Sequence, residues 1–233
     1  MPSSAESVTS LGLANGLLFT IARALDRASG SRVRLFKYYF VAQPVPVQPE
    51  AAFSKSSQTR IYQAFPGDGI MTRLPRPPEV VARRFADGAV CFIAARADTL
   101  VGFIWIKRET YCEDEVRCHY VLRPAAQLAW DFDAYVAPQF RMSRAFVQLW
   151  EAANAFLREQ GCRWSISRIS AFNAGSLAAH RRLGIVHLHT GVFLAAGSMQ
   201  LAAFSCFPYL HLAVGPSSCP RLVFSPPVPP ARA

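Results

Sequence analysis

Two carboxylates stand two residues apart in the segment W-D-F-D-A-Y-V, which alternates between apolar and polar residues. Alternation along a strand places Asp131, Asp133 and Tyr135 on one face of a sheet. Carboxylates in such a place need solvent or a partner, so the two acids can take a proton from an attacking group or hold a cationic one. Equally, they can pair with Arg117 or Arg123 from the strand expected beside them, and both interpretations stay open.

A histidine near the end of an expected helix can move protons. His180 lies in N-A-G-S-L-A-A-H-R-R-L-G, which runs from Asn173 to Gly184. With an unperturbed pKa of ~6.5, a histidine can act as acid or base near neutrality. The alternative is a histidine on the helix surface beside Arg181 and Arg182.

Three serines lie on one expected strand, but the nucleophile elbow of a hydrolase is missing. Ser165, Ser167 and Ser170 are not surrounded by a G-x-S-x-G motif, so a hydrolase triad is unsupported. We expect these serines to line a cleft.

The elements that must position these residues follow from periodicity. Apolar residues recur at three- and four-residue spacings from Ala145 to Gln160, with Gly161 as the stop, which predicts a helix. A second helix is expected from about Ala174 to Leu183, capped by Gly184. Strands are expected at 130–136, 163–170, 186–195 and 199–207.

The first half of the chain predicts helices at its start and middle and an antiparallel meander after them. Helices are expected from Leu11 to Leu25, ending near Gly30, and from Glu79 to Ala86, after two prolines. Residues 42–74 are expected to form a long segment between the first strand and the second helix, which we call the excursion. Strands are expected at 34–41, at 90–95 and 100–107 as a tight hairpin, and at 116–122 before the strand at 130–136.

This order of elements, over residues 79–207, resembles the GNAT superfamily, whose members transfer an acyl group from acyl-CoA to an amine. The segment V-A-P-Q-F-R, from Val136 to Arg141, matches the end of the family's fourth strand and the residues that follow it. Asn173 and Gly184 match the two ends of the helix after the family's fifth strand. The resemblance implies an α+β fold with a mixed, mostly antiparallel twisted sheet of about seven strands flanked by helices. We expect a single domain at 1–233, with an N-terminal helix within 1–30 and a proline-rich tail at 208–233.

The resemblance also implies where the cofactor binds. Backbone N–H groups at a helix start converge on the pyrophosphate, and glycines let the backbone approach. Here Arg144 and Phe146 stand at the two glycine positions, a departure that bears on how tightly CoA is held. Arg141 and Arg144 can compensate by pairing with phosphates, or this is a solvated helix start with no ligand. The implied cofactor-binding residues are Val136, Arg141, Ser143, Arg144, Ala145, Asn173 and Ser176.

The implied chemistry places His180 where family members often carry a tyrosine that protonates the departing CoA thiolate. Asp133 and Asp131 are the candidates for a general base. The resemblance puts the acyl-pantetheine arm between 133–137 and 165–169. The expected function is an N-acyltransferase that moves an acyl group, acetyl in the simplest case, from acyl-CoA to a small-molecule amine by direct attack.

Two alternatives are kept for the function. The donor can be an acyl carrier protein or an aminoacyl-tRNA, for which a positive surface would serve as a docking site. Alternatively, the chain is a catalytically silent member of the fold that binds a ligand or assembles with other proteins.

Charge and composition limit the partners. The formal charge is +10, from 25 Lys and Arg against 15 Asp and Glu, but the arginines are scattered and no run of five basic residues occurs. No specific nucleic-acid partner is therefore expected. Apolar residues make up 52% of the chain, which predicts a large core.

The six cysteines form no C-x-x-C pair, which favours a reduced, cytoplasmic protein. Cys112, Cys118 and His119 are too loosely spaced to predict a zinc site, and no metal is expected. The segment up to Glu6 has no Lys or Arg and so lacks the positive region of a secretory signal.

A charge-free run from Val192 to Val214 is long enough to cross a bilayer. Polar residues interrupt it, and Gly197 and Ser198 predict a turn between two buried strands, so no membrane span is expected. The apolar tail could instead cover the sheet edge of a second copy in a homodimer.

Overall fold

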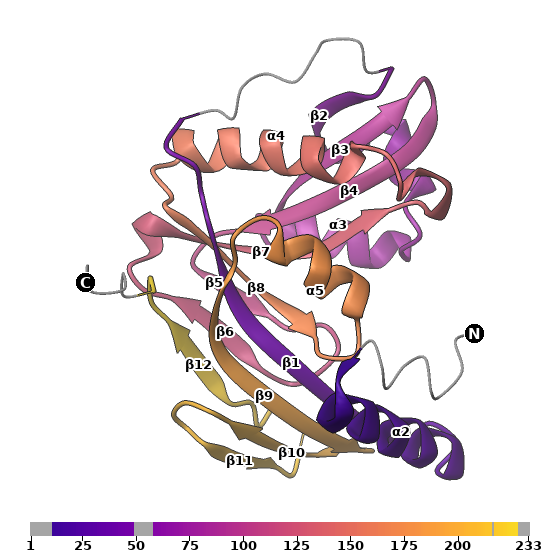
Figure 1. Cartoon of the computed structure of the whole chain (residues 1–233), viewed down its shortest axis with the longest axis vertical. Helices are drawn as coiled ribbons and strands as arrows, with labels where there is room; N and C mark the ends of the chain where they lie inside the picture. The colour runs from indigo at the N-terminus through magenta and orange to yellow at the C-terminus, as the bar shows by residue number, and fades with distance from the viewer. Residues whose placement is uncertain (1–10, 49–57, 216, 228–233) are drawn as a thin grey trace. The chain divides into compact units, whose positions relative to one another are not determined.

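The computed structural model describes residues 11–48, 58–215 and 217–227, which fold into two compact units (Figure 1). Unit 1 is formed by Met1–Pro44, Tyr111–Val121 and Ile166–Ala233, and unit 2 by Val45–Thr110 and Leu122–Ser165. Glu6, residues 49–57 of the expected excursion and the last prolines of the tail lie outside the described residues.

Unit 2 is built on four antiparallel strands in the order β7-β4-β3-β2. Their bounds are β2 Arg60–Ala64, β3 Val90–Arg96, β4 Thr99–Lys107 and β7 Leu128–Val136. The turn between β3 and β4 contains Ala97 at a positive φ of 48°, and Val90 pairs with Ile106 at the far end. The hairpin expected at 90–95 and 100–107 is therefore confirmed.

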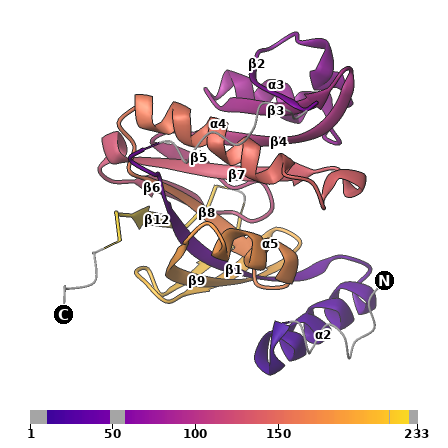
Figure 2. The same cartoon turned by 45° about the horizontal axis from the view of Figure 1, so that its top comes forward.

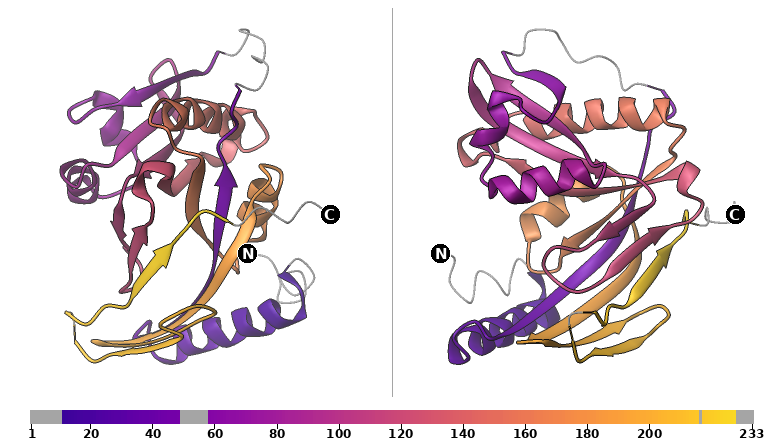
Figure 3. Two further views of the ribbon diagram at one scale, coloured as in Figure 1. Left: turned by 90° about the vertical axis from the view of Figure 1, so that its left-hand side faces the viewer. Right: turned by 180° about the vertical axis from the view of Figure 1, so that it is seen from behind.

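Two helices cover opposite faces of these strands. The helix α4, Ala145–Glu159, places Phe156 5.6 Å from Phe92, whereas α3, Pro78–Ala86, places Phe85 4.9 Å from Trp105. Phe92 pairs across the ladder with Ile104, the neighbour of Trp105, so the two contacts lie on different faces. Figure 3 shows α3 on the side away from α4. Short 3-10 helices complete the unit: η1 Gly69–Arg73, η2 Ala125–Gln127 and η3 Pro138–Phe140.

Unit 1 contains the larger sheet segment, in the order β11-β10-β9-β1-β8. The bounds are β1 Val33–Pro44, β8 Trp164–Ser170, β9 Val186–Ala196, β10 Met199–Phe204 and β11 Leu210–Ala213. The first strand, β1, thus lies between β8 and β9 and pairs antiparallel with β9. Next to β8, the carbonyl of Lys37 accepts a hydrogen bond from the N–H of Ala171 at 2.8 Å.

A second, three-stranded sheet faces the larger one within unit 1, in the order β12-β6-β5. Its strands are β5 Thr110–Cys112, β6 His119–Leu122 and β12 Arg221–Phe224. The ring of Phe40 lies 5.4 Å from that of Tyr120 and 5.1 Å from that of Phe224. All three are fully buried, so aromatic packing between the two sheets forms the core of the unit.

The other face of β1 carries two helices. The helix α5, Ala174–Arg181, packs Leu177 against Val41 and Ile169, and Figure 2 shows it over β1. The helix α2, Leu13–Ala28, joins β1 through Asn15, whose Nδ2 donates to the hydroxyl of Tyr39 at 2.9 Å. Both helices were expected at these places.

The fold class is confirmed as α+β with a mostly antiparallel sheet, but the expected meander is wrong. β6 pairs with β5 and β12, and β4 pairs directly with β7. Alternation along a strand indicates its faces but not its neighbours, so the error could not be seen in the sequence. Twelve strands are described against about seven expected; β2 and η1 lie in the excursion, and β11 and β12 in the tail.

The charge-free run at 192–214 forms parts of β9, β10 and β11, with the predicted turn at Gly197, where φ is 57°. Within the described ranges, none of the helices is long and apolar enough to cross a membrane.

Candidate active site

The strand β7 carries a bulge at the position of the second acid. Phe103 of β4 pairs with Tyr135, and Trp105 pairs with Phe132, so Asp133 and Ala134 together oppose a single residue. Asp133 has a φ of 50°, a left-handed conformation that Asp tolerates better than most residues. The extra residue moves Tyr135 to the face of Phe132, and the prediction that Tyr135 shares a face with Asp131 is wrong.

The carboxylate of Asp133 is held by two arginines. Arg76 donates from Nε to Oδ2 at 2.7 Å and from Nη2 to Oδ1, and Nη1 of Arg84 donates to Oδ2 at 2.5 Å. The Asp133 side chain is only 12% exposed. Of the two interpretations offered by the sequence, this geometry favours ion pairing, but the partners are Arg76 and Arg84. Arg117 instead donates to the carbonyls of Ser198 and Gly215 in unit 1.

Aromatic rings surround this cluster. The guanidinium of Arg84 lies 5.4 Å from the ring of Trp105 and 5.1 Å from that of Phe132, and Arg76 lies 5.6 Å from the ring of Phe103. Such cation–π contacts stabilise desolvated guanidinium groups. Burial raises the pKa of the nearby Cys91 thiol, and the charge of Asp133 adds to this effect. Cys91 is therefore a thiol without nucleophilic character near neutrality.

Asp131 lies on the opposite face of β7, where it pairs across the ladder with Ile106. It is 3% exposed and accepts a hydrogen bond from Oγ of Ser165 at 2.7 Å. Ser165 itself is fully buried, and Ser167 is buried in unit 1. Ser165 therefore satisfies a buried carboxylate, and a cleft-lining role for the serines of β8 stays a prediction.

The segment after β7 brings five of the predicted cofactor-binding residues together: Val136, Arg141, Ser143, Arg144 and Ala145. Nε of Arg141 donates to the carbonyl of Val136 at 3.4 Å. Ser143 donates from Oγ to the carbonyl of Phe140 at 2.6 Å and accepts the N–H of Ala145 at 3.2 Å. Arg141 and Arg144 are exposed. The α4 start thus combines two cations with the positive end of a helix dipole.

Gly102, which belongs to no motif in the sequence, lets these elements meet. A Cβ at Gly102 would lie 2.5 Å from the carbonyl oxygen of Tyr135 and 3.2 Å from Cδ1 of Leu149. Gly102 pairs with Val136, the last residue of β7. The absence of a side chain at Gly102 therefore lets β4 run close under both β7 and α4.

The remaining predicted residues, Asn173, Ser176 and His180, belong to unit 1. Oδ1 of Asn173 accepts the N–H of Ser176 at 3.0 Å, which caps the start of α5 as expected. His180 is 6% exposed, so the reading as a helix-surface histidine is wrong. The turns of a short helix packed on β1 bury one of its faces, and His180 lies on that face.

The environment of His180 favours a neutral imidazole. Nδ1 lies 2.8 Å from the carbonyl oxygen of Ser176, so Nδ1 carries the proton that it donates and Nε2 is the acceptor. Burial lowers the pKa of His180, and the bond to the Ser176 carbonyl partly opposes this shift. His180 is thus better suited to accept a proton than to give one near neutrality.

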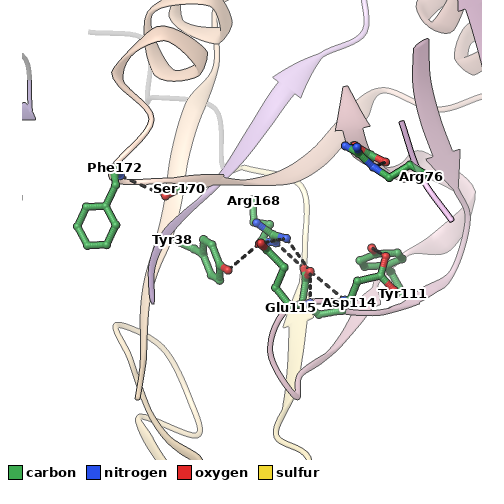
Figure 4. A network of polar contacts seen from close by, with 10 residues as sticks. Tyr38, Arg76, Tyr111, Asp114, Glu115, Arg168, Ser170 and Phe172 are labelled. Atoms are coloured by element: carbon green, nitrogen blue, oxygen red, sulfur yellow. Dashed lines mark hydrogen bonds and ion pairs between the residues drawn. The ribbon is translucent and has the colours of Figure 1, made fainter. Parts of the chain in front are cut away.

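A charged network in unit 1 was not anticipated (Figure 4). Arg168 donates from Nε and Nη2 to Glu113 at 2.5 and 2.7 Å, and Nη2 also lies 2.7 Å from Oε2 of Glu115. Tyr38 donates to Glu115 at 2.9 Å, and the guanidinium stacks 4.3 Å above its ring. The turn at 113–115 therefore anchors the second sheet to β1 and β8.

All six cysteines are free thiols. Sγ of Cys112 lies 3.0 Å from Nε2 of His119, whereas Cys118 is buried away from this pair. Across the described part of the chain, no three His, Cys, Asp or Glu residues gather to hold a metal ion.

Comparisons with known proteins agree with this geometry. The chain matches the model of the acetyltransferase (GNAT) family over residues 59–185, more than half of its length. No curated protein sequence matches it.

Solved structures share the fold at low identity. A GNAT family acetyltransferase from Novosphingobium aromaticivorans is 16% identical with a TM-score of 0.50, over 74% of this chain and 66% of that one. A tandem GNAT protein from the clavulanic acid biosynthesis pathway is 15% identical with a TM-score of 0.52, over 75% of this chain and 57% of that one. The chain thus spans less than two thirds of either protein. Together with the family match, the shared fold shows that this chain belongs to the GNAT family of acetyltransferases.

Proposed function

We propose that this chain is an N-acyltransferase that transfers an acyl group, acetyl in the simplest case, from acyl-CoA to a small-molecule amine by direct attack. Membership of the family supports acyl transfer. The observation that carries the choice of donor is the start of α4, where Arg141 and Arg144 are exposed just before a helix of 15 residues. When bound, acyl-CoA supplies the activated acyl group as a thioester. In this proposal the acyltransferase core occupies residues 79–207.

The residues at the α4 start fit the diphosphate of CoA. Guanidinium groups make charge-assisted contacts with phosphate oxygens, and the helix dipole adds to the attraction. Ser143 holds the loop in place through its contacts with Phe140 and Ala145, so little conformational entropy is lost on binding. Val136 would contact the cofactor through its backbone beside this loop. Asn173 and Ser176 would contact the cofactor at the start of α5.

In the proposal, Nε2 of His180 takes up the proton that the amine loses when the new C–N bond forms and returns it to the CoA thiolate that leaves as the C–S bond breaks, because burial favours the neutral imidazole as the resting form. Asp133 acts by holding the bulge through Arg76 and Arg84, and Asp131 acts as the buried partner of Ser165. A direct proton-acceptor role for either carboxylate would need one of these contacts to break. Rate enhancement would come mainly from positioning.

Ligand-induced stabilisation tests the proposal. CoA or acetyl-CoA at about 100 times its dissociation constant should stabilise the native chain by about 2.7 kcal/mol, which raises the melting temperature by several degrees. The double variant Arg141→Ala, Arg144→Ala should lose most of this shift, whereas Arg221→Ala, an exposed arginine of β12, should retain it. Absence of any shift in the wild-type chain at millimolar ligand would rule out acyl-CoA as the donor.

One observation favours a different donor. Arg144 and Phe146 stand where the family pattern has glycines, and the formal charge is +10, so an acyl carrier protein or aminoacyl-tRNA could dock on the positive surface. Binding of an acyl carrier protein that weakens steeply with salt, in a chain that ignores CoA, would support this alternative. If neither donor binds and His180→Phe changes no transfer activity, the third hypothesis, a catalytically silent ligand-binding protein, gains support.

A further inference from the structure

The helix α2 carries an apolar stripe on its outer side. With ~3.6 residues per turn, residues spaced by three or four lie on one face of a helix. Leu13, Leu17 and Ile21 follow this spacing and are exposed by 83%, 64% and 43%. Ala24 and Ala28 continue the same face and are also exposed. We call these five residues the outer stripe.

The inner side of α2 is the side that unit 1 covers. Oδ1 of Asn15 accepts a hydrogen bond from Nζ of Lys37 at 2.9 Å, and Nδ2 of Asn15 donates to Tyr39. The ring of Phe19 lies 5.5 Å from that of Phe172. A surface helix of a soluble domain usually turns its apolar face inward. Here polar groups help to join α2 to β1, and no described helix or strand covers the outer stripe (Figure 1).

Arginines border the outer stripe on one side. Arg27 is exposed and lies ten residues after Leu17, about 80° away round the helix axis, and Arg23 lies one turn before Arg27. Arg32 is exposed in the turn that follows the helix. The only carboxylate in the sequence from residue 11 to residue 48 is Asp26, nine residues after Leu17 and therefore on the opposite side of the helix. The border of the stripe is thus cationic, and no carboxylate of this segment lies beside it.

An apolar stripe with a cationic border complements an anionic lipid surface. Helices of this kind lie in the plane of a membrane, with the apolar face ~5 to 10 Å deep and the arginine head groups at the level of the phosphates. The five side chains of the outer stripe have no hydrogen-bonding group, so they suit fluid hydrocarbon better than a partner recognised by directional contacts. The formal charge of +10 attracts the whole chain to such a surface.

We propose that α2 binds the surface of an anionic phospholipid bilayer through the outer stripe and the arginines beside it. Leu13, Leu17 and Ile21 insert among the acyl chains, whereas Arg27 and Arg32 contact lipid phosphates. The helix lies along the surface and does not cross it, because its 16 residues span only ~24 Å of the ~30 Å hydrocarbon core. The proposal does not depend on acyl transfer.

Flotation of the full chain with lipid vesicles tests this inference. The wild-type chain should bind vesicles of phosphatidylglycerol and phosphatidylcholine at least about tenfold more strongly than vesicles of phosphatidylcholine alone, and added salt should reduce this preference. Leu17→Glu removes one leucine from the bilayer and adds a negative charge, so its partition coefficient should fall at least about tenfold. Arg27→Glu should weaken binding to the mixed vesicles by at least about fivefold.

Val223→Glu is the matched control, because it makes the same charge change at another exposed apolar side chain. Val223 belongs to β12 and is 47% exposed. Tyr39, which contacts α2, and Phe40, which contacts β12, are neighbours on β1 and point to opposite faces of the sheet. Since α2 and β12 lie on opposite sides of the larger sheet, Val223→Glu should bind vesicles like the wild type.

Four outcomes would overturn the inference: a wild-type chain that does not float with the mixed vesicles, equal flotation with phosphatidylcholine alone, a natively folded Leu17→Glu chain that floats like the wild type, or a Val223→Glu chain that loses as much binding. If Leu17→Glu does not fold, Leu13→Glu at a more exposed position takes its place with the same expectation. A wild-type chain that ignores vesicles but self-associates, beside a Leu17→Glu chain that does not, would show that a second copy covers the stripe instead.

Discussion

Oδ2 of Asp133 and Nη1 of Arg84 lie 2.5 Å apart and link the bulge of β7 to α3. Both side chains are nearly buried, at 12% and 9% exposure. Because Asp133 has a positive φ, the bulge is a conformation that its surroundings must hold in place. The ion pair thus connects a local backbone feature to the packing of a helix about fifty residues away.

Removal of Arg84 should therefore destabilise the chain well beyond an ordinary surface change. Arg84→Met leaves the buried carboxylate with Arg76 alone, and we expect a loss of about 2 to 4 kcal/mol in the free energy of unfolding. Urea unfolding followed by tryptophan fluorescence measures it. Arg83→Met, the exposed neighbour on the same helix, should change stability by less than about 0.5 kcal/mol.

The double variant Arg84→Met, Asp133→Asn separates pairing from packing. It should lose less than the two single variants added together, because asparagine tolerates the positive φ and the buried carboxylate is gone, while the guanidinium of Arg76, at 32% exposure, can be solvated. Strict additivity would mean that the two side chains do not interact in solution.

Gly102 should not accept even one methyl group. A Cβ there would lie 2.5 Å from the backbone oxygen of Tyr135, which cannot move without disturbing the ladder, so Gly102→Ala should cost about 1 to 3 kcal/mol. Gly69→Ala is the control, since a Cβ at Gly69 meets nothing within 4 Å. Thermal unfolding of the two variants beside the wild type gives the comparison, and equal melting temperatures would contradict the close approach.

The thiols should react in a fixed order. Cys112 is exposed beside His119, whereas burial raises the pKa of Cys91 and of Cys118 and suppresses their thiolates. With Ellman's reagent, the native chain should show a fast phase that Cys112→Ser abolishes, and complete reaction of all six thiols should require denaturant. A fast phase that survives in Cys112→Ser would show that another thiol is more accessible than the structure indicates.

Long periodic segments could be predicted from the sequence, and the site's key contacts could not. The helix at 145–159 and the hairpin at 90–107 have enough residues for their period to be read. A bulge adds one residue without breaking the alternation of apolar and polar residues. Nothing in the sequence therefore indicates that Tyr135 lies on the other face. The arginines that hold Asp133 are 57 and 49 residues away in sequence, a distance at which no local pattern reports contact.

More of α5 could be predicted from the sequence, because the capping asparagine before a helix and the glycine after it are local signals. Asn173 was expected at its start and caps it there, whereas the helix ends at Arg181, before the expected Leu183, and Gly184 lies in the turn that follows, with a φ of 75°. Burial of His180 could not be foreseen, since two arginines follow it and suggest a solvated face. Which side of a short helix packs depends on the strand beneath it, and β1 comes from the far end of the chain.

The buried state of His180 predicts how stability depends on pH. Its folded-state pKa is lowered, mainly by burial, below the value of ~6.5 expected in the unfolded chain. Between these two values the unfolded chain binds a proton that the folded chain excludes, so the free energy of unfolding falls as pH drops through about 6.5. Burial lowers the pKa of His187 and His189 as well, and both add to the same trend.

His180→Asn isolates the share of His180, because the asparagine amide can still donate to the Ser176 carbonyl. The stability difference between the wild type and this variant should shrink as pH falls from about 7.5 to about 5.5, by up to ~1.4 kcal/mol for each unit by which the pKa is lowered. Urea unfolding across this range measures it. Ser176→Ala, which keeps the backbone carbonyl and removes only a hydroxyl 3.4 Å from Nδ1, should follow the wild-type pH dependence. Parallel curves for His180→Asn and the wild type would mean that the imidazole titrates alike in both states, and hence that it is not buried in solution.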